Sequence, residues 1–276
     1  MSVLIGYDET PYGHDALVLG LQLAGETDQP PTVATVFPDD ESGLVAAMQD
    51  HQWLERARQA AEQKLDTARA LAADRPGVTF EAIGPTSAAR GLHEYAEQSQ
   101  ASLLVVGSSA AAAMGRITPG STVSRLLHGA PCPVAVAPRG YRRRPTSLTG
   151  IAVAYDGSTQ AQHALDVAVP IAQRLDASLR LVGVTPRRND ALQADLDAAV
   201  RGLPAGVKAV AEVLVDDDVV DTLADLPGQD TDLLVCGSRG YGPVRQVLLG
   251  GVSSRVVRAA SYPVMIVPRG APADPA

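Results

Sequence analysis

The sequence of this 276-residue chain is an internal duplication. Three segments of the first half recur in the same order in the second half. The matched segments are VLIGYDET (3–10) with IAVAYDGS (151–158), LLVVGSSA (103–110) with LLVCGSRG (233–240), and PCPVAVAP (131–138) with SYPVMIVP (261–268). A repeat of this length is long enough to form a complete domain, so the chain is expected to fold as two copies of one domain in tandem.

The offsets between the matched segments predict where the two copies begin and end. The first pair is separated by 148 positions and the other two pairs by 130, so the second copy is 18 residues shorter between its second and third strands. A longer helical pattern at 42–74 in the first copy accounts for the difference. The basic stretch PRGYRRRP at 138–145 is interpreted as a solvated linker, because it is rich in proline, glycine and charge. We expect a first domain at 1–140, a linker at 141–149, a second domain at 150–270 and a tail at 271–276.

Each copy alternates short apolar strands with helical segments. In the second copy the strand GIAVAY precedes a helical pattern that Ser158 is positioned to cap, and further helical patterns follow near 189–201 and 217–226. Strands separated by helices pair in parallel, and continuous apolar strands such as LLVV are buried on both faces. We therefore predict an α/β fold of two tandem open α/β sandwiches, each a five-stranded parallel sheet with helices on both faces.

A glycine-rich loop follows the fourth strand of each copy, and an aspartate follows the first strand. Both positions lie at the carboxyl ends of parallel strands, where open α/β sheets bind their ligands. The loop of the second copy holds no acidic residue, and its glycines and arginines are Gly237, Arg239, Gly240, Gly242, Arg245, Gly250 and Gly251. Glycine lets phosphate oxygens approach backbone N–H groups, and the N-terminus of the following helix attracts anions. The loop therefore predicts an anion site, and phosphate is the anion that suits it.

The second copy resembles the universal stress protein family. The resemblance rests on the spacing Gly237-x2-Gly240-x9-Gly250, on YDGS near the start of the copy and on YPVMIVP at its end. It extends over nearly the whole chain as two tandem copies. ATP-binding members of that family carry the pattern G-x2-G-x9-G-[S/T]. They hold adenosine between the first-strand aspartate and the backbone at the end of the second strand, with the triphosphate on the glycine loop and the next helix. The implied fold is Rossmann-like, of the adenine nucleotide alpha hydrolase type.

The resemblance implies one set of nucleotide-binding residues in each copy. In the second copy Asp156 holds the nucleoside, Val184 contacts adenine through its backbone, and the loop with the following helix holds the phosphates. The phosphate-binding positions there are Gly237, Arg239, Gly240, Gly250, Gly251, Val252 and Ser253. The first copy offers Asp8, Val36, Gly107, Gly120, Ser121, Thr122 and Ser124.

Each copy departs from the family pattern once in the loop. Gly251 stands where the family has serine or threonine, so that hydroxyl is missing and Ser253 is the nearest substitute. In the first copy Ala110 replaces the second glycine, which is unfavourable where φ is positive or a phosphate lies close. Glu9 also places a negative charge beside Asp8. We therefore predict that the better site lies in the second domain.

The resemblance implies a nucleotide-dependent regulator of the stress response that is not a dedicated enzyme. ATP is the expected ligand, with or without Mg²⁺, and slow ATP hydrolysis is the most activity expected. Cyclic AMP is an alternative ligand, since it shares the adenine and ribose contacts. Two other classes remain open. One is a ligand-free dimerisation scaffold, and the other is an adenylating enzyme, although YDETPYG and YDGSTQA occupy the position of the SGGxDS-like loop of such enzymes.

Composition narrows the choice of partners and compartment. A formal net charge of -8 argues against a general nucleic-acid binder, and no apolar run is long enough to span a bilayer. Cys132 and Cys236 are interpreted as small apolar residues beside buried strands. Residues 1–10 show no signal-peptide pattern, so a cytoplasmic location is expected.

Two further sequence features bear on metals and on assembly. The five histidines show no metal-ligand spacing, and the acidic run at 216–218 is interpreted as the N-terminal cap of a helix rather than as a Mg²⁺ site. In the family the final strands pair subunits. In a tandem chain the final strands of the two copies are able to pair within one molecule, which predicts a pseudo-two-fold unit and a homodimer of such units.

Overall fold

The computed structural model describes the chain except residues 26–28, 38–50, 144–146, 227–230, 239–250 and 270–276. The first half contains β1 (Val3–Gly6), α1 (Pro11–Ala24), β2 (Thr32–Val36), α2 (His51–Leu71), β3 (Thr79–Ile83), α3 (Ala88–Gln98), β4 (Leu103–Gly107), α4 (Ser121–Gly129) and β5 (Val134–Ala137). A short 3-10 helix, η1 (Tyr141–Arg143), follows. The second half contains β6 (Gly150–Ala154), α5 (Thr159–Leu175), β7 (Ser178–Thr185), α6 (Asp190–Arg201), β8 (Ala209–Val215), α7 (Val219–Ala224), β9 (Leu233–Gly237), α8 (Gly251–Ala259) and β10 (Val264–Val267).

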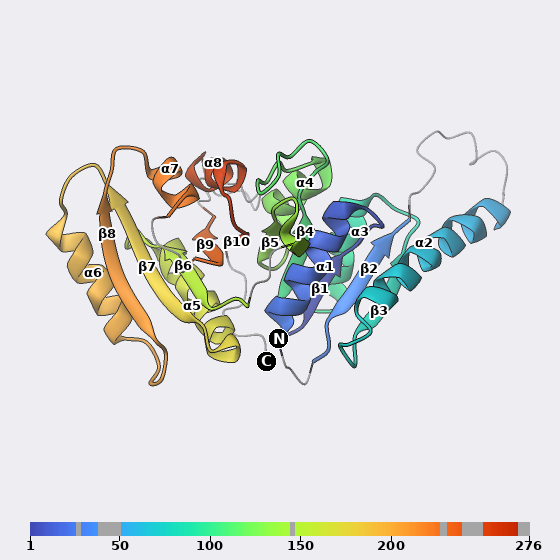
Figure 1. The fold of residues 1–276 in the computed structure, drawn as a ribbon, viewed down its shortest axis with the longest axis horizontal. Helices are drawn as coiled ribbons and strands as arrows, with labels where there is room; N and C mark the ends of the chain where they lie inside the picture. Colours follow the sequence, from blue (N-terminus) through green and yellow to red (C-terminus); the bar gives the residue numbers. More distant parts are fainter. Residues whose placement is uncertain (26–28, 38–50, 144–146, 227–230, 239–250, 270–276) are drawn as a thin grey trace.

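The described strands form one ten-stranded sheet in the order β3-β2-β1-β4-β5-β10-β9-β6-β7-β8. Strands within each half pair in parallel, as the sequence predicts. The two halves meet where β5 and β10 pair antiparallel, with Val136 opposite Val264 and Val134 opposite Ile266. The sheet is therefore continuous through the middle of the molecule (Figure 1). The predicted α/β fold is confirmed, and the two final strands pair within one chain.

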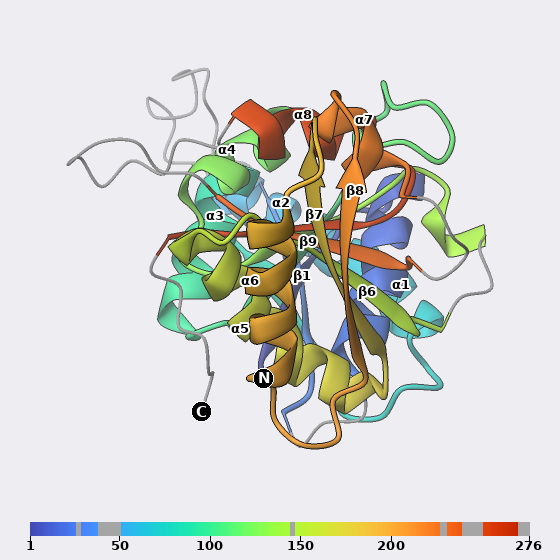
Figure 2. The same cartoon turned by 90° about the vertical axis from the view of Figure 1, so that its left-hand side faces the viewer.

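Helices cover both faces of this sheet because its strands are apolar on both faces. In β1, Val3 and Ile5 pack into one hydrophobic core and Leu4 into the other. The first core lies under α1, α2, α5 and α6, and the second under α3, α4, α7 and α8. Figure 2 looks along the molecule onto α6 and β8, with α7 and α8 above them. None of the helices in the described part of the chain combines the length and the apolar character needed to cross a membrane.

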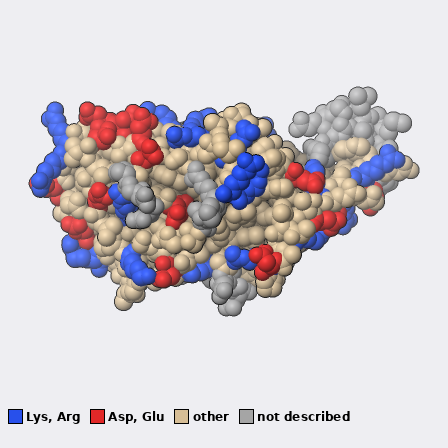
Figure 3. Space-filling model, viewed as in Figure 1, with Lys and Arg blue, Asp and Glu red and all other residues tan. Residues whose placement is uncertain are grey.

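Two predicted helix starts are confirmed. Ser158 caps α5, where its side chain accepts a hydrogen bond of 3.2 Å from the backbone N–H of Ala161. Asp218 caps α7 and accepts from the backbone N–H groups of Val220 and Asp221 at 2.9 and 3.0 Å. These hydrogen bonds lower the pKa of Asp218, led by the one from Asp221, because they stabilise the charged carboxylate. Figure 3 shows the acidic side chains that gather over α7. The acidic run at 216–218 thus includes the helix cap that the sequence predicts.

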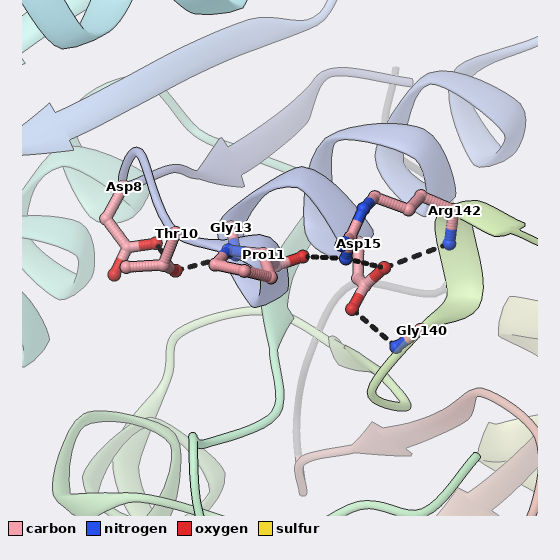
Figure 4. A network of polar contacts seen from close by, with 7 residues as sticks. All are labelled: Asp8, Thr10, Pro11, Gly13, Asp15, Gly140 and Arg142. Atoms are coloured by element: carbon pink, nitrogen blue, oxygen red, sulfur yellow. Dashed lines mark hydrogen bonds and ion pairs between the residues drawn. The ribbon is translucent and has the colours of Figure 1, made fainter. Parts of the chain in front are cut away.

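The interpretation of 138–145 as a solvated linker is wrong for the residues around η1. Tyr141 is only 2% exposed, and its hydroxyl donates a 2.6 Å hydrogen bond to Gln22 on α1. Asp15, which is fully buried on α1, accepts hydrogen bonds from the backbone N–H groups of Gly140 and Arg142 at 2.7 and 2.9 Å (Figure 4). A buried carboxylate requires such donors, and the chain after β5 supplies them. The segment therefore packs against α1.

Both cysteines are buried, which confirms their interpretation as small apolar residues. Cys132 is 2% exposed and Cys236 is 3% exposed, and burial raises the pKa of each thiol to about 12. The thiolate is the reactive form, so neither residue should react readily in the folded protein. We expect no modification by iodoacetamide at pH 8 in buffer and modification of both residues in denaturant, measured by mass spectrometry. Rapid modification of the folded protein would contradict the burial of the residue that reacts.

Candidate functional site

The first half opens a cavity of about 400 Å³ at the carboxyl ends of β1, β2 and β4. Six residues that the sequence predicts as nucleotide-binding line this single cavity: Asp8, Val36, Gly107, Gly120, Ser121 and Thr122. Ser124 lies one turn further along α4, where its backbone N–H bonds to the carbonyl of Gly120, and it does not line the cavity. The structure therefore brings together the strand-end aspartate, the end of the second strand and the N-terminus of α4.

The turn between β1 and α1 holds Asp8 at the edge of this cavity. The backbone N–H of Tyr7, just after β1, donates to the carbonyl of Ala34 in β2 at 2.8 Å. The chain therefore stays beside β2 for one residue after β1 ends. Thr10 then caps α1, accepting from the N–H of Gly13 at 3.1 Å and donating its hydroxyl proton to Asp8 (Figure 4). A Cβ atom at Gly13 would overlap the backbone and carboxylate of Asp8. Glycine at this position therefore keeps the turn tight and the carboxylate in place.

The loop between β4 and α4 is tied down at both ends. Ser108 is 3% exposed, and its hydroxyl oxygen accepts a 2.8 Å hydrogen bond from the backbone N–H of Thr118. The guanidinium of Arg139 donates to the carbonyls of Ala110 and Ala112 at 3.1 and 2.7 Å. Helix α4 then begins after Gly120, which has no side chain to cap it, and no acidic residue lies in its first turn. An uncapped helix N-terminus with its free N–H groups thus lines the cavity.

Of the two features that weigh against the first half in the sequence, the strain at Ala110 is absent from the structure. Among the described residues other than glycine, positive φ occurs at Gln100 and Asp176, so Ala110 adopts an ordinary backbone conformation. Ala110 is exposed and lies outside the set of residues that line the cavity. The carboxylate of Glu9 accepts a 2.8 Å hydrogen bond from the Thr67 hydroxyl on α2. The strain expected at Ala110 is therefore not present.

The second half has a matching cavity of about 280 Å³ at the ends of β6, β7 and β9. Five predicted residues line it, namely Asp156, Val184, Gly237, Val252 and Ser253. Gly251 begins α8 and does not line the cavity. Arg239, Gly240 and Gly250 lie outside the described residues. The Ser253 hydroxyl donates to the carbonyl of Gly237 at 2.9 Å, so its proton is already engaged with the protein.

A glycine at the end of the fourth strand has the same role in both halves. A Cβ atom at Gly107 would overlap the carbonyl of Tyr12 at the start of α1, and one at Gly237 would lie 2.5 Å from the carbonyl of Gln160 at the start of α5. Glycine therefore allows the first helix of each half to approach the fourth strand closely. This approach brings the strand-end aspartate and the glycine loop to one cavity.

Tyrosine precedes the strand-end aspartate in both halves and stays protonated at neutral pH. Burial, followed by the charges of Glu9 and Asp8, raises the pKa of Tyr7 to about 12. Burial, followed by the charge of Asp195 and of two further aspartates, also raises the pKa of Tyr155. Because a protonated phenol is a poor base, neither tyrosine provides proton-abstracting chemistry to its cavity.

Several residues of the first cavity carry no clear signal in the sequence. Lys64 of α2, Tyr12 and Gly13 of α1, and Ser109 after β4 also line it. The helical pattern at 42–74 predicts α2 but does not fix which of its side chains faces the strand ends. The matching position of Gly13 in the second half is Ala161, so the duplication itself gives no reason to expect glycine there.

The fold and these cavities define a class of protein, namely a tandem α/β chain with a cavity at the strand ends of each half. The chain belongs to the universal stress protein family, whose model matches residues 1–138 and 149–268. A universal stress protein of Mycobacterium tuberculosis is 27% identical, with 97% of this chain and 100% of that protein covered. One from Mycolicibacterium smegmatis is 28% identical, with 96% of each chain covered.

A solved structure shares this fold. A universal stress protein of Archaeoglobus fulgidus has a TM-score of 0.75 at 22% identity, with 98% of each chain covered, and so has the same fold. A universal stress protein solved in complex with cAMP is 28% identical over 44% of this chain and 98% of its own, with a TM-score of 0.37.

Proposed function

We propose that this protein binds an adenine nucleotide, ATP, as a regulatory ligand of the stress response and is not a dedicated enzyme. The observation that supports this proposal most is the first cavity, which joins Asp8, the end of β2 at Val36 and the uncapped N-terminus of α4. Its volume of about 400 Å³ lies within the usual range of small-molecule sites. A carboxylate at one end and a helix N-terminus at the other suit a ligand with hydroxyl groups and phosphates.

Each part of the ligand has a matching part of the cavity. The ribose hydroxyls are placed to donate to the carboxylate of Asp8, and adenine is placed against the backbone at Val36. The phosphates then lie toward Ser121 and Thr122, where backbone N–H groups and the positive end of the α4 dipole favour anions. The second cavity offers the same order with Asp156, Val184 and the start of α8. We therefore propose the same binding mode for both halves.

The described lining of the first cavity favours binding over catalysis. Its charged side chains are those of Asp8 and Lys64, and the Asp8 carboxylate already accepts a hydrogen bond from the Thr10 hydroxyl. This hydrogen bond occupies one carboxylate oxygen of Asp8 and holds the side chain against the start of α1, away from the role of activating a water. Any hydrolysis of ATP in this cavity should therefore be slow, and the nucleotide should act as a bound signal.

Calorimetric titration of the nucleotide-stripped protein with ATP tests this function. We expect saturable binding, with one or two sites for each chain, and with weaker binding of adenosine because it lacks the phosphate contacts. Titration with cAMP in parallel distinguishes the two nucleotides. Two sites would mean that both halves bind, and one site would mean that one half has lost its ligand. Thermal unfolding with each nucleotide gives a second measurement of binding. If neither ATP nor cAMP at millimolar concentration produced heat or raised the unfolding temperature, the proposal would be contradicted and the ligand-free scaffold favoured.

A further inference from the structure

Lys64 brings a positive charge to the first cavity from a helix that the family pattern does not use. It lies on α2, where its neighbour Leu65 and, one turn later, Ala68 are fully buried in the core beneath the sheet. Those buried residues fix the rotation of α2 about its axis. Lys64 is then half-buried at the edge of the cavity that also contains Asp8 and the start of α4.

No carboxylate neutralises this lysine within the part of the chain that the structure describes. The ion pairs there engage Arg69, Arg90, Arg142, Arg180, Arg188 and Lys208, and they do not include Lys64. Glu9, the acidic residue beside Asp8, is instead bonded to Thr67, three residues further along α2. Lys64 lines the cavity and is in none of these ion pairs, so its positive charge is available to a ligand.

The corresponding helix of the second half carries the opposite charge near its cavity. Asp195 of α6 lies beside the turn after β6, with one carboxylate oxygen 3.6 Å from where a Cβ of Gly157 would be. Among the described residues that line the second cavity there is no lysine or arginine. The helix that follows the second strand thus differs in charge between two otherwise matched sites.

We propose that Lys64 sets the number of phosphates that the first cavity prefers, by binding the terminal phosphates of a nucleoside triphosphate. This inference rests on the proposed function, and it goes further because it names nucleoside triphosphates as the preferred ligands of the first cavity. Charge-assisted hydrogen bonds from lysine to phosphate are about twice as strong as neutral ones. The contact grows with each added phosphate charge, so Lys64 favours ATP over AMP and contributes nothing to the binding of adenosine.

The test compares Lys64→Gln with the wild-type protein, using ATP, AMP and adenosine as ligands. Arg58→Gln is the matched control, because it removes one positive charge from an exposed position of the same helix. Protection of the peptide 118–129 from hydrogen exchange measures ligand binding in the first half alone, since that peptide contains α4. We expect Lys64→Gln to weaken ATP binding about tenfold, equivalent to about 1.4 kcal/mol, with adenosine binding unchanged. Arg58→Gln should match the wild type, and Lys64→Arg should restore most of the preference.

Each other outcome overturns a specific statement. Equal losses for ATP and adenosine would mean that Lys64 only supports the shape of the cavity, and no loss for ATP would mean that it does not contact phosphate. Either result overturns the role of Lys64 while ATP binding itself stands. If no nucleotide protects residues 118–129 of the wild-type protein, the proposed function of this cavity fails, and the role of Lys64 fails with it.

Discussion

Replacing Asp15 with alanine is expected to lower the free energy of unfolding by about 3 kcal/mol, because it breaks a buried charged network. The carboxylate of Asp15 is fully buried and accepts from the backbone N–H groups of Gly140 and Arg142. The Arg142 guanidinium forms an ion pair with it at 3.1 Å and also donates to the Pro11 carbonyl at 2.6 Å. Alanine would leave a buried N–H group at Gly140 without its acceptor. Denaturation in guanidinium chloride measures the loss.

Two further variants make this expectation specific. Asp15→Asn keeps the size of the side chain but removes its charge, and we expect it to cost about 2 kcal/mol. Glu94→Ala breaks an exposed ion pair with Arg90 on α3 and should cost less than about 0.5 kcal/mol. Equal stability of Asp15→Ala and Glu94→Ala would show that the network around η1 does not hold the chain after β5 onto α1.

The network around Asp15 also shows why the sequence did not predict the packing of this segment. Proline, glycine and four arginines in PRGYRRRP are typical of a solvated linker, and this composition says nothing about a distant acceptor. The partner, Asp15, lies on α1, 125 positions before Gly140. The matching position in the second half is His163, so the duplication gives no hint of a buried carboxylate. A comparison of the two copies cannot predict a contact that only one of them makes.

The fold itself is predictable because its signals are local and occur twice. Apolar strands alternate with helical patterns, and the strand LLVV is apolar at consecutive positions, which requires cover on both faces of the sheet. The pairing of the two final strands follows because two edge strands in one chain are available to each other. Sequence spacing also brings Asp8 and Gly120 to one cavity, since both follow strands whose carboxyl ends share an edge of the sheet.

The details of the candidate site are less predictable, since they depend on the rotation of helices and on backbone angles. Lys64 faces the cavity because of how α2 packs on the sheet, which no short pattern encodes. The role of Ala110 depends on its φ angle, which is not positive, so the substitution of glycine costs less than the sequence suggests. The preference for the second domain rests on a loop whose residues 239–250 lie outside the described part of the chain, and it stays a prediction.

Gly120→Asp is expected to abolish ATP binding in the first half without unfolding the protein. Gly120 is the N-cap of α4 and has a φ of -75°, which any residue adopts, and a Cβ atom there would lie 3.4 Å from the Cβ of Ser109, an ordinary contact. An aspartate at this position would cap the helix and complement its dipole, which should raise the free energy of unfolding by roughly 0.5 kcal/mol. The same carboxylate would stand where the proposed mode places the phosphates.

The opposite signs of these two effects make Gly120→Asp a strict test of the site. At an effective dielectric constant of about 20, like charges about 4 Å apart repel by about 4 kcal/mol, which corresponds to a loss of ATP affinity of at least 100-fold. Gly120→Asn is the matched control, because asparagine caps the helix as well as aspartate but adds no charge, so it should bind ATP far more tightly than Gly120→Asp. Thermal unfolding and protection of residues 118–129 by ATP measure the two effects separately. A more stable Gly120→Asp protein that still binds ATP like the wild type would place the phosphates elsewhere, because no uncharged contact offsets a repulsion of that size.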